Sequence, residues 1–359
     1  MQRLTVILVL LLGCAVTAAA QVVEIDDLTA PTSPAFILLE VSPAAVERPE
    51  NAKTFAVNLL NKLSSTKGLP QNYALEVTPY WLASHTGLEF HEYQKPSPGQ
   101  SIMQSFALSV ATVPMPGATT GADPVGTRLG MGMRMNIFNG KPDTALETKV
   151  GLLADAQDRF LTARRAGDAA GAATAGMDLE KYALEIQSLD TERVGFFLAL
   201  AAGQVWAFPE DDAARRTAEK SGIWLTPSYR FRACNVGRDE PCEQRVDIVG
   251  VVRELKSTGQ DARWDYGGRL VWRASRELYL SAESLHRRDR LAAGTVTAQA
   301  GSDRTVGLLE YRIKKDLVLY GSFGRDFMKD NGVKPLVSLF GLNLGFGTAP
   351  RVLADKAEP

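Results

Sequence analysis

The chain has 359 residues, with 40 Lys and Arg against 41 Asp and Glu, so its formal net charge is −1 at pH 7. This balance excludes the strongly basic surface that attracts nucleic acid. A mean hydropathy of −0.09 excludes a bundle of membrane-spanning helices, each of which needs about 20 mostly apolar residues.

Residues 1–20 have the pattern of a secretory signal peptide. Arg3 provides a positive start, an apolar core follows, and three alanines at 18–20 form a small-residue cleavage site. The sequence therefore predicts export. An alternative processing site lies within the same segment, because the sequence Leu-Leu-Gly-Cys ending at Cys14 is similar to a bacterial lipobox, which would leave a lipidated cysteine.

Cleavage after residue 20 leaves two cysteines, Cys234 and Cys242. An oxidising compartment favours a disulfide between them, and two free thiols are the alternative. No His or further Cys lies nearby, so no metal site is expected there.

Residues 21–70 are interrupted repeatedly by proline. They contain a short apolar run at 36–41 and a helix-like stretch at 51–63, whose apolar residues share one face. Three interpretations of the helix-like stretch stay open: a periplasmic helix, a plug inside a barrel, or a surface lid.

Alternation with a period of two runs through most of residues 71–347. In Arg263–Arg273 one face begins with Trp264 and ends with Trp272, and four charged residues stand on the opposite face. A half-buried strand of a soluble protein also alternates. Aromatic residues at both ends of an apolar face, opposite a charged face, are typical of a strand between lipid and a watery lumen.

Eleven segments follow this pattern, and each is about as long as a tilted strand that crosses a bilayer. They are residues 73–81, 105–113, 128–137, 193–206, 223–232, 245–255, 263–273, 277–286, 304–312, 316–327 and 336–347. Single-chain bacterial barrels have an even number of strands, so about twelve are expected, with ten or fourteen as alternatives. The missing strand is expected at 36–41 or 88–94.

The period changes within residues 142–190, which are rich in Ala, Leu, Glu, Arg and Asp. Two helical runs are separated by glycines there. The pattern predicts a helical insertion between two strands, outside the bilayer. A helical hairpin packed on a barrel rim is the favoured interpretation, and a cap that binds a partner is the alternative.

On these segments the chain resembles a bacterial outer-membrane β-barrel protein of the porin or transporter type, over about residues 73–347. The resemblance implies an all-β membrane fold: an antiparallel, up-and-down transmembrane β-barrel in the outer membrane of a Gram-negative cell, inserted by the barrel-assembly machinery. Phe346 fits the aromatic residue that usually ends the last strand. Thirteen residues follow it, however, so residues 348–359 form a tail that departs from the pattern.

The inward faces of the strands collect arginines and fewer acids, and they form the candidate site. The predicted pore-lining residues are Arg128, Arg134, Arg230, Arg232, Arg245, Arg253, Arg263, Asp265, Arg269, Arg273, Glu283, Glu310 and Arg312. An arginine fork binds carboxylate or phosphate groups, so an arginine excess would favour anions. Alternatively, the charges pair across strands and fill a narrow interior.

The function expected from these patterns is a pore or transporter for small polar solutes, with anions favoured. The alternative is a structural barrel that docks another envelope protein through residues 142–190. A lipid hydrolase is disfavoured, because neither His85 nor His286 has a Ser two positions on to serve as nucleophile. We therefore expect no catalytic residues, no cofactor, and no nucleic-acid partner.

Overall fold

A computed structural model of the chain describes residues 21–24, 33–40, 55–58, 73–80, 87–89, 96–115, 125–142, 144–188, 193–232, 244–260, 262–289, 301–314, 317–328, 333–345 and 351–353. The predicted signal peptide, the predicted disulfide between Cys234 and Cys242, and His85 lie outside these residues.

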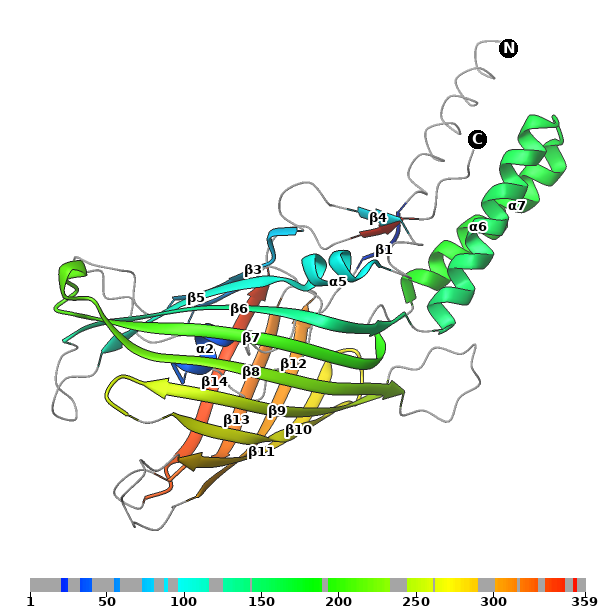
Figure 1. The fold of residues 1–359 in the computed structure, drawn as a ribbon. Coiled ribbons are helices and arrows are strands. Elements are labelled where there is room, and N and C mark those ends of the chain that lie inside the picture. Colours follow the sequence, from blue (N-terminus) through cyan, green and yellow to red (C-terminus); the bar gives the residue numbers. More distant parts are fainter. Residues whose placement is uncertain are drawn as a thin grey trace.

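Eleven strands form one antiparallel, up-and-down sheet, as the alternation predicted (Figure 1). They are β3 (Tyr73–Val77), β5 (Ala107–Met115), β6 (Gly126–Lys141), β7 (Val194–Pro209), β8 (Thr217–Arg232), β9 (Arg245–Ser257), β10 (Arg263–Arg273), β11 (Leu278–Asp289), β12 (Ser302–Lys314), β13 (Leu317–Arg325) and β14 (Leu336–Gly345). Each strand pairs with its neighbours in chain order, so every connection between them is that of a meander.

A shorter strand, β2 (Phe55–Asn58), links the two ends of this series. It pairs with β14 at Ala56 and Phe55 and with β3 along its whole length, so the hydrogen-bonded order runs from the last strand back to the first. The helix predicted at 51–63 is therefore wrong for these four residues. Pairing with strands far away in the chain overrides a local apolar pattern that also suits a helix.

The described residues at the two positions proposed for the missing strand, 36–40 and 88–89, do not join the main sheet. Residues 36–41 overlap the helix α2 (Pro34–Leu38). Pro34 begins this helix, and its missing N–H costs no hydrogen bond there, because N–H groups of the first turn have no partner within the helix. Within 88–94 the chain does form a strand, β4 (Gly87–Glu89), but it pairs with β15 (Arg351–Leu353). Together with β1 (Gln21–Glu24) these make a separate three-stranded sheet, so part of the predicted tail is strand.

The two faces of the main sheet differ as the alternation predicted. On β10 the side chains of Trp264 and Leu270 are 39% and 52% exposed, whereas those of Asp265 and Arg269 are 0% and 3% exposed. The buried, charged face is called the inner face below, and the opposite one the outer face.

The predicted helical insertion is confirmed as the helices α6 (Thr144–Arg165) and α7 (Ala169–Ser188). Gly167 has φ of 74° in the turn between them, a conformation that favours glycine. The hairpin extends away from the main sheet (Figure 1). The other helices are α5 (Pro98–Ser105) and the 3-10 turn η2 (Ala213–Arg215). Among the described helices, none is long and apolar enough to cross a membrane.

The apolar core of the main sheet forms around α2. This helix packs against β5, β6, β7 and β8, within the curve of the sheet (Figure 1). Residues of α2 share a buried cluster with Trp224 of β8, Leu285 of β11 and Val318 of β13. Residues 33–40 of the N-terminal segment therefore supply the centre of this core.

Candidate functional site on the inner face

Glycines of three adjacent strands form the seat of α2. A Cβ atom at Gly132 of β6 would lie 2.5 Å from Cβ of Pro34 and 2.8 Å from the backbone N of Ala35. At Gly203 of β7 it would lie 2.7 Å from Cδ1 of Leu38. Real Cβ atoms do not approach so closely, so the helix can lie this near the sheet only because these positions lack side chains.

Polar contacts hold both ends of the same segment. The backbone N–H of Ala35 donates to Oγ of Ser109 on β5, at 3.1 Å. At the other end, Nζ of Lys220 on β8 donates to the carbonyl oxygen of Leu38 at 3.3 Å and to Oε1 of Glu40 at 2.8 Å. The carbonyl is one of those that a helix leaves unpaired at its C-terminus. The segment is thus bound by side chains as well as by apolar packing.

Glu40 has an unusual backbone and an unusual setting. Its φ of 62° lies in the left-handed region, which is uncommon for a residue with a side chain. Burial among protein groups would by itself raise the pKa of Glu40, but the Lys220 ammonium, with smaller effects of Arg287 and Arg128, holds that pKa below the ordinary value. The Glu40 side chain is nevertheless 72% exposed, so water reaches it.

Beyond α2, ion pairs cover the inner face, and most of them join different strands. The pairs and their N–O distances are Arg134–Glu76 (2.7 Å), Arg230–Asp247 (2.9 Å), Arg253–Asp265 (2.7 Å), Arg287–Asp265 (2.8 Å), Arg269–Glu310 (2.8 Å), Arg304–Glu283 (2.9 Å) and Arg304–Asp326 (2.9 Å). Burial of these charges is tolerated because each has an oppositely charged, hydrogen-bonded partner.

The predicted pore-lining residues fall into two groups. The buried ones are Arg134, Arg230, Arg245, Arg253, Asp265, Arg269, Arg273, Glu283 and Glu310. The partly exposed ones are Arg128, Arg232, Arg263 and Arg312. For seven of the buried residues the geometry matches the alternative interpretation, in which charges pair across strands: Arg134, Arg230, Arg253, Asp265, Arg269, Glu283 and Glu310. Among the partly exposed ones, Arg128 pairs with Glu219 at 2.8 Å.

Residues of the site that are absent from the predicted pore-lining list include Glu40, Lys220 and Arg287. Arg287 donates to Asp265 through two nitrogens and stacks over the ring of Phe327, 3.7 Å from its centroid. Its place on the alternating pattern, two positions after Leu285, was a usable signal. No signal in the sequence pairs Lys220 with Glu40, which lies 180 residues earlier.

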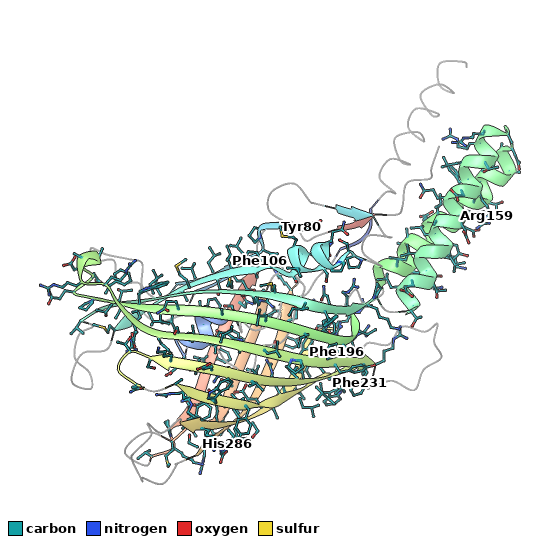
Figure 2. All side chains as sticks on the ribbon, viewed as in Figure 1. Tyr80, Phe106, Arg159, Phe196, Phe231 and His286 are labelled. Atoms are coloured by element: carbon teal, nitrogen blue, oxygen red, sulfur yellow. The ribbon has the colours of Figure 1, made fainter. Side chains whose placement is uncertain are left out.

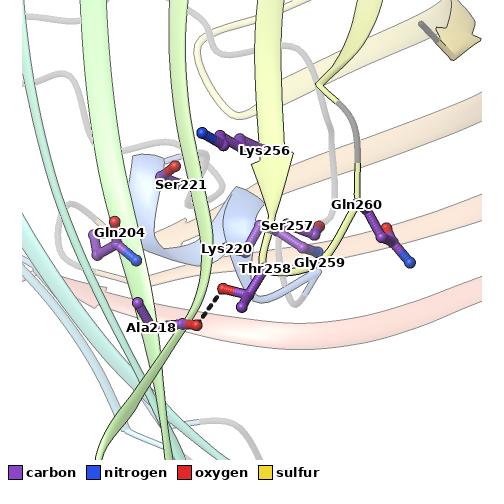
Figure 3. A pocket seen from close by; sticks show the side chains of 9 residues that line it. All are labelled: Gln204, Ala218, Lys220, Ser221, Lys256, Ser257, Thr258, Gly259 and Gln260. Atoms are coloured by element: carbon purple, nitrogen blue, oxygen red, sulfur yellow. Dashed lines mark hydrogen bonds between the residues drawn. The ribbon is translucent and has the colours of Figure 1, made fainter. Parts of the chain in front are cut away.

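A polar cavity of about 560 Å³ reaches Lys220 at the end of β8 and β9 (Figure 3). Its lining includes Lys256, Gln204, Ser221 and Thr258, and the Thr258 hydroxyl donates to the carbonyl oxygen of Ala218. Ammonium, amide and hydroxyl groups are suited to carboxylate or phosphate oxygens.

In the part of the chain that the structure describes, His286 does not join the ion pairs of the inner face. Nδ1 of His286 lies 2.7 Å from Oδ1 of Asp303, and both side chains are exposed. Among the described residues there is no group of three or more His, Cys, Asp or Glu placed to hold a metal ion.

No protein-family model and no curated protein sequence matches the chain. A functional proposal therefore depends on the two faces of the sheet and on the seat of α2.

Proposed function

We propose that the sheet closes through β2 into a twelve-strand transmembrane β-barrel of the bacterial outer membrane. We further propose that this barrel is a pore or transporter for small polar solutes, with anions favoured. The observation that carries the proposal is the chemical contrast between the two faces: apolar side chains are exposed on the outer face, while charges are buried on the inner one.

The outer face supports the membrane part of the proposal. Exposed apolar side chains recur on it from β5 to β14, among them Met131, Ile248, Leu270 and Phe340. Phe196 and Phe231 belong to the same set (Figure 2). Soluble monomers rarely expose continuous apolar surface of this extent, since it costs free energy in water. Contact with lipid removes that cost.

The inner face supports a gated passage. A continuous open lumen is inconsistent with α2 at the centre of the core and with ion pairs across the inner face. Passage of a solute therefore requires displacement of α2, which side chains hold at both ends. The proposed resting state is closed.

Planar-bilayer recording tests the pore. We expect infrequent current steps from the wild-type protein and frequent ones from Gly132→Ala, since the added methyl group pushes α2 from its seat. Reversal potentials in a KCl gradient then report the preference for anions. Silence of both proteins after verified insertion would refute a pore.

A separate experiment tests the membrane location. Brominated lipids should quench the fluorescence of Trp264 and Trp272; absence of quenching would refute the membrane location.

A second candidate function is favoured by the α6–α7 hairpin. It extends from the sheet (Figure 2). Met177 and Leu184 on it are 65% and 60% exposed. The ion pairs Lys149–Glu185 and Arg159–Asp178 join its two helices, which would preserve its shape away from the sheet. This arrangement suits a partner-binding envelope barrel. Deletion of residues 144–188 should abolish co-purification of an envelope protein while the sheet stays folded; an unchanged pull-down would contradict this function.

A further inference from the structure

Lys220 of β8 joins three features that are distant in the sequence. Its ammonium group binds the C-terminal carbonyl of α2 at Leu38 and the carboxylate of Glu40, and it also lines the polar cavity. Both protein partners come from the segment that fills the core. A group that entered through the cavity could reach the same ammonium.

The partner carboxylate is bound differently from the other acids of the inner face. Asp265 and Glu310 are almost fully buried and are held by arginines of the sheet itself. Glu40 is 72% exposed, and it is held by a single lysine that is 21% exposed. Because both charges are accessible to water, an ion from solution can exchange with the carboxylate without first unfolding the sheet.

The surroundings of Lys220 suit an anion. Lys256, Gln204 and the hydroxyl groups of Ser221 and Thr258 line the same cavity. Arg128 and Arg287 act on the Glu40 carboxylate from β6 and β11. Two lysines and no acidic side chain are among the residues that line the cavity, so the cavity favours carboxylate or phosphate oxygens over a cation.

We propose that Glu40 is an internal substitute for the carboxylate or phosphate group of a small solute, and that Lys220 is the residue for which the solute and Glu40 compete. When the solute occupies Lys220, Glu40 and the carbonyl of Leu38 lose their shared donor, and the C-terminal end of α2 is released. This inference rests on the proposed function, because it names the solute class and the trigger of the gate.

Phosphate binding to the purified full-length protein in detergent tests the competition, with inorganic phosphate as the probe and calorimetry as the measurement. Glu40→Gln should bind phosphate about three- to fivefold more tightly than wild type, the size of effect that an exposed ion pair accounts for. Lys220→Gln should lose this binding. The matched control is Glu210→Gln, since Glu210 is also exposed, at 71%, and pairs with Arg215 at 2.9 Å; it should bind phosphate like wild type.

Hydrogen exchange of residues 33–40 tests the release. Phosphate should accelerate this exchange in the wild type, whereas chloride at equal ionic strength should not. Glu40→Gln should exchange rapidly without phosphate. Equal phosphate affinity of wild type and Glu40→Gln would overturn the proposed competition, and so would unchanged affinity in Lys220→Gln. A hydrogen-exchange rate at residues 33–40 that does not change with phosphate would overturn the proposed release of α2.

These measurements need no membrane and no current, so they separate the two proposals. Phosphate-dependent release from a protein that is silent in bilayers would refute the pore and leave the anion site standing. Current steps with no effect of Glu40→Gln on phosphate binding would refute the anion site and leave the pore standing. Heat-dependent gel migration checks that each variant is folded.

Discussion

Arg269 of β10 donates to Glu310 of β12 at 2.8 Å, reaching across the intervening strand β11. Their exposures are 3% and 2%. The pair therefore ties three consecutive strands together from the inner face, in addition to the backbone hydrogen bonds.

Removal of one partner of this pair should be costly. We expect Glu310→Ala to lower the free energy of unfolding by about 3–5 kcal/mol, because it leaves a buried guanidinium unpaired. The double variant Arg269→Met, Glu310→Leu should recover most of the lost stability, since neither charge of this pair is then buried. Urea titration of refolded protein measures both. Glu277→Ala, at an exposed turn acid, should stay within about 0.5 kcal/mol of wild type; an equal loss there would contradict the explanation.

A charged residue introduced on the outer face should destabilise the protein when that face lies in lipid. Leu270, at 52% exposure, is on the outer face of β10. Leu270→Arg should destabilise protein folded into vesicles by about 2–4 kcal/mol if the position is near the bilayer midplane. Ala214→Arg, on the exposed turn η2 between β7 and β8, should be nearly neutral. A neutral Leu270→Arg would show that water, and not lipid, covers this face.

The seat of α2 should tolerate no added methyl group. Gly132→Ala places Cβ 2.5 Å from Pro34, and we expect a loss of about 1–3 kcal/mol from overpacking. Faster hydrogen exchange at residues 33–40 should accompany it. Gly151→Ala, in α6 with nothing within 4 Å of the added Cβ, should instead stabilise by up to about 1 kcal/mol through helix propensity. A lower stability of Gly151→Ala than of Gly132→Ala would contradict the close packing of α2.

Acid should release α2 through Glu40. The pKa of Glu40 is held below its ordinary value of 4.5, mainly by Lys220 against the effect of burial. The stabilisation is therefore complete above pH 4.5 and is lost as the pH falls through the lower, folded-state pKa. The protection of amides 33–40 against hydrogen exchange, corrected for the pH dependence of the intrinsic exchange rate, should fall below pH 4.5 in the wild type. In Glu40→Gln this protection should already be low at pH 7 and should change little with acid; a wild type whose protection is insensitive to acid would refute the assignment.

Much of the fold follows from local pattern in the sequence. Alternation around Trp264 and Asp265 predicted both the strand and the side that each residue faces, because successive side chains of a strand point to opposite sides. The change of period within 142–190 likewise predicted the two helices. Local pattern misled at residues 36–41 and 51–63, where short apolar runs suit helix and strand alike.

The sequence by itself determined the eleven long strands of the main sheet, which face carries charge, and where the helical insertion lies, since these properties depend on neighbours a few positions away. Only the tertiary structure decided that Arg269 meets Glu310, that Lys220 meets Glu40, and that α2 occupies the core. The reason is physical: contacts between distant segments depend on strand register and on how the curved sheet encloses α2. Neither property can be inferred from a short stretch of residues.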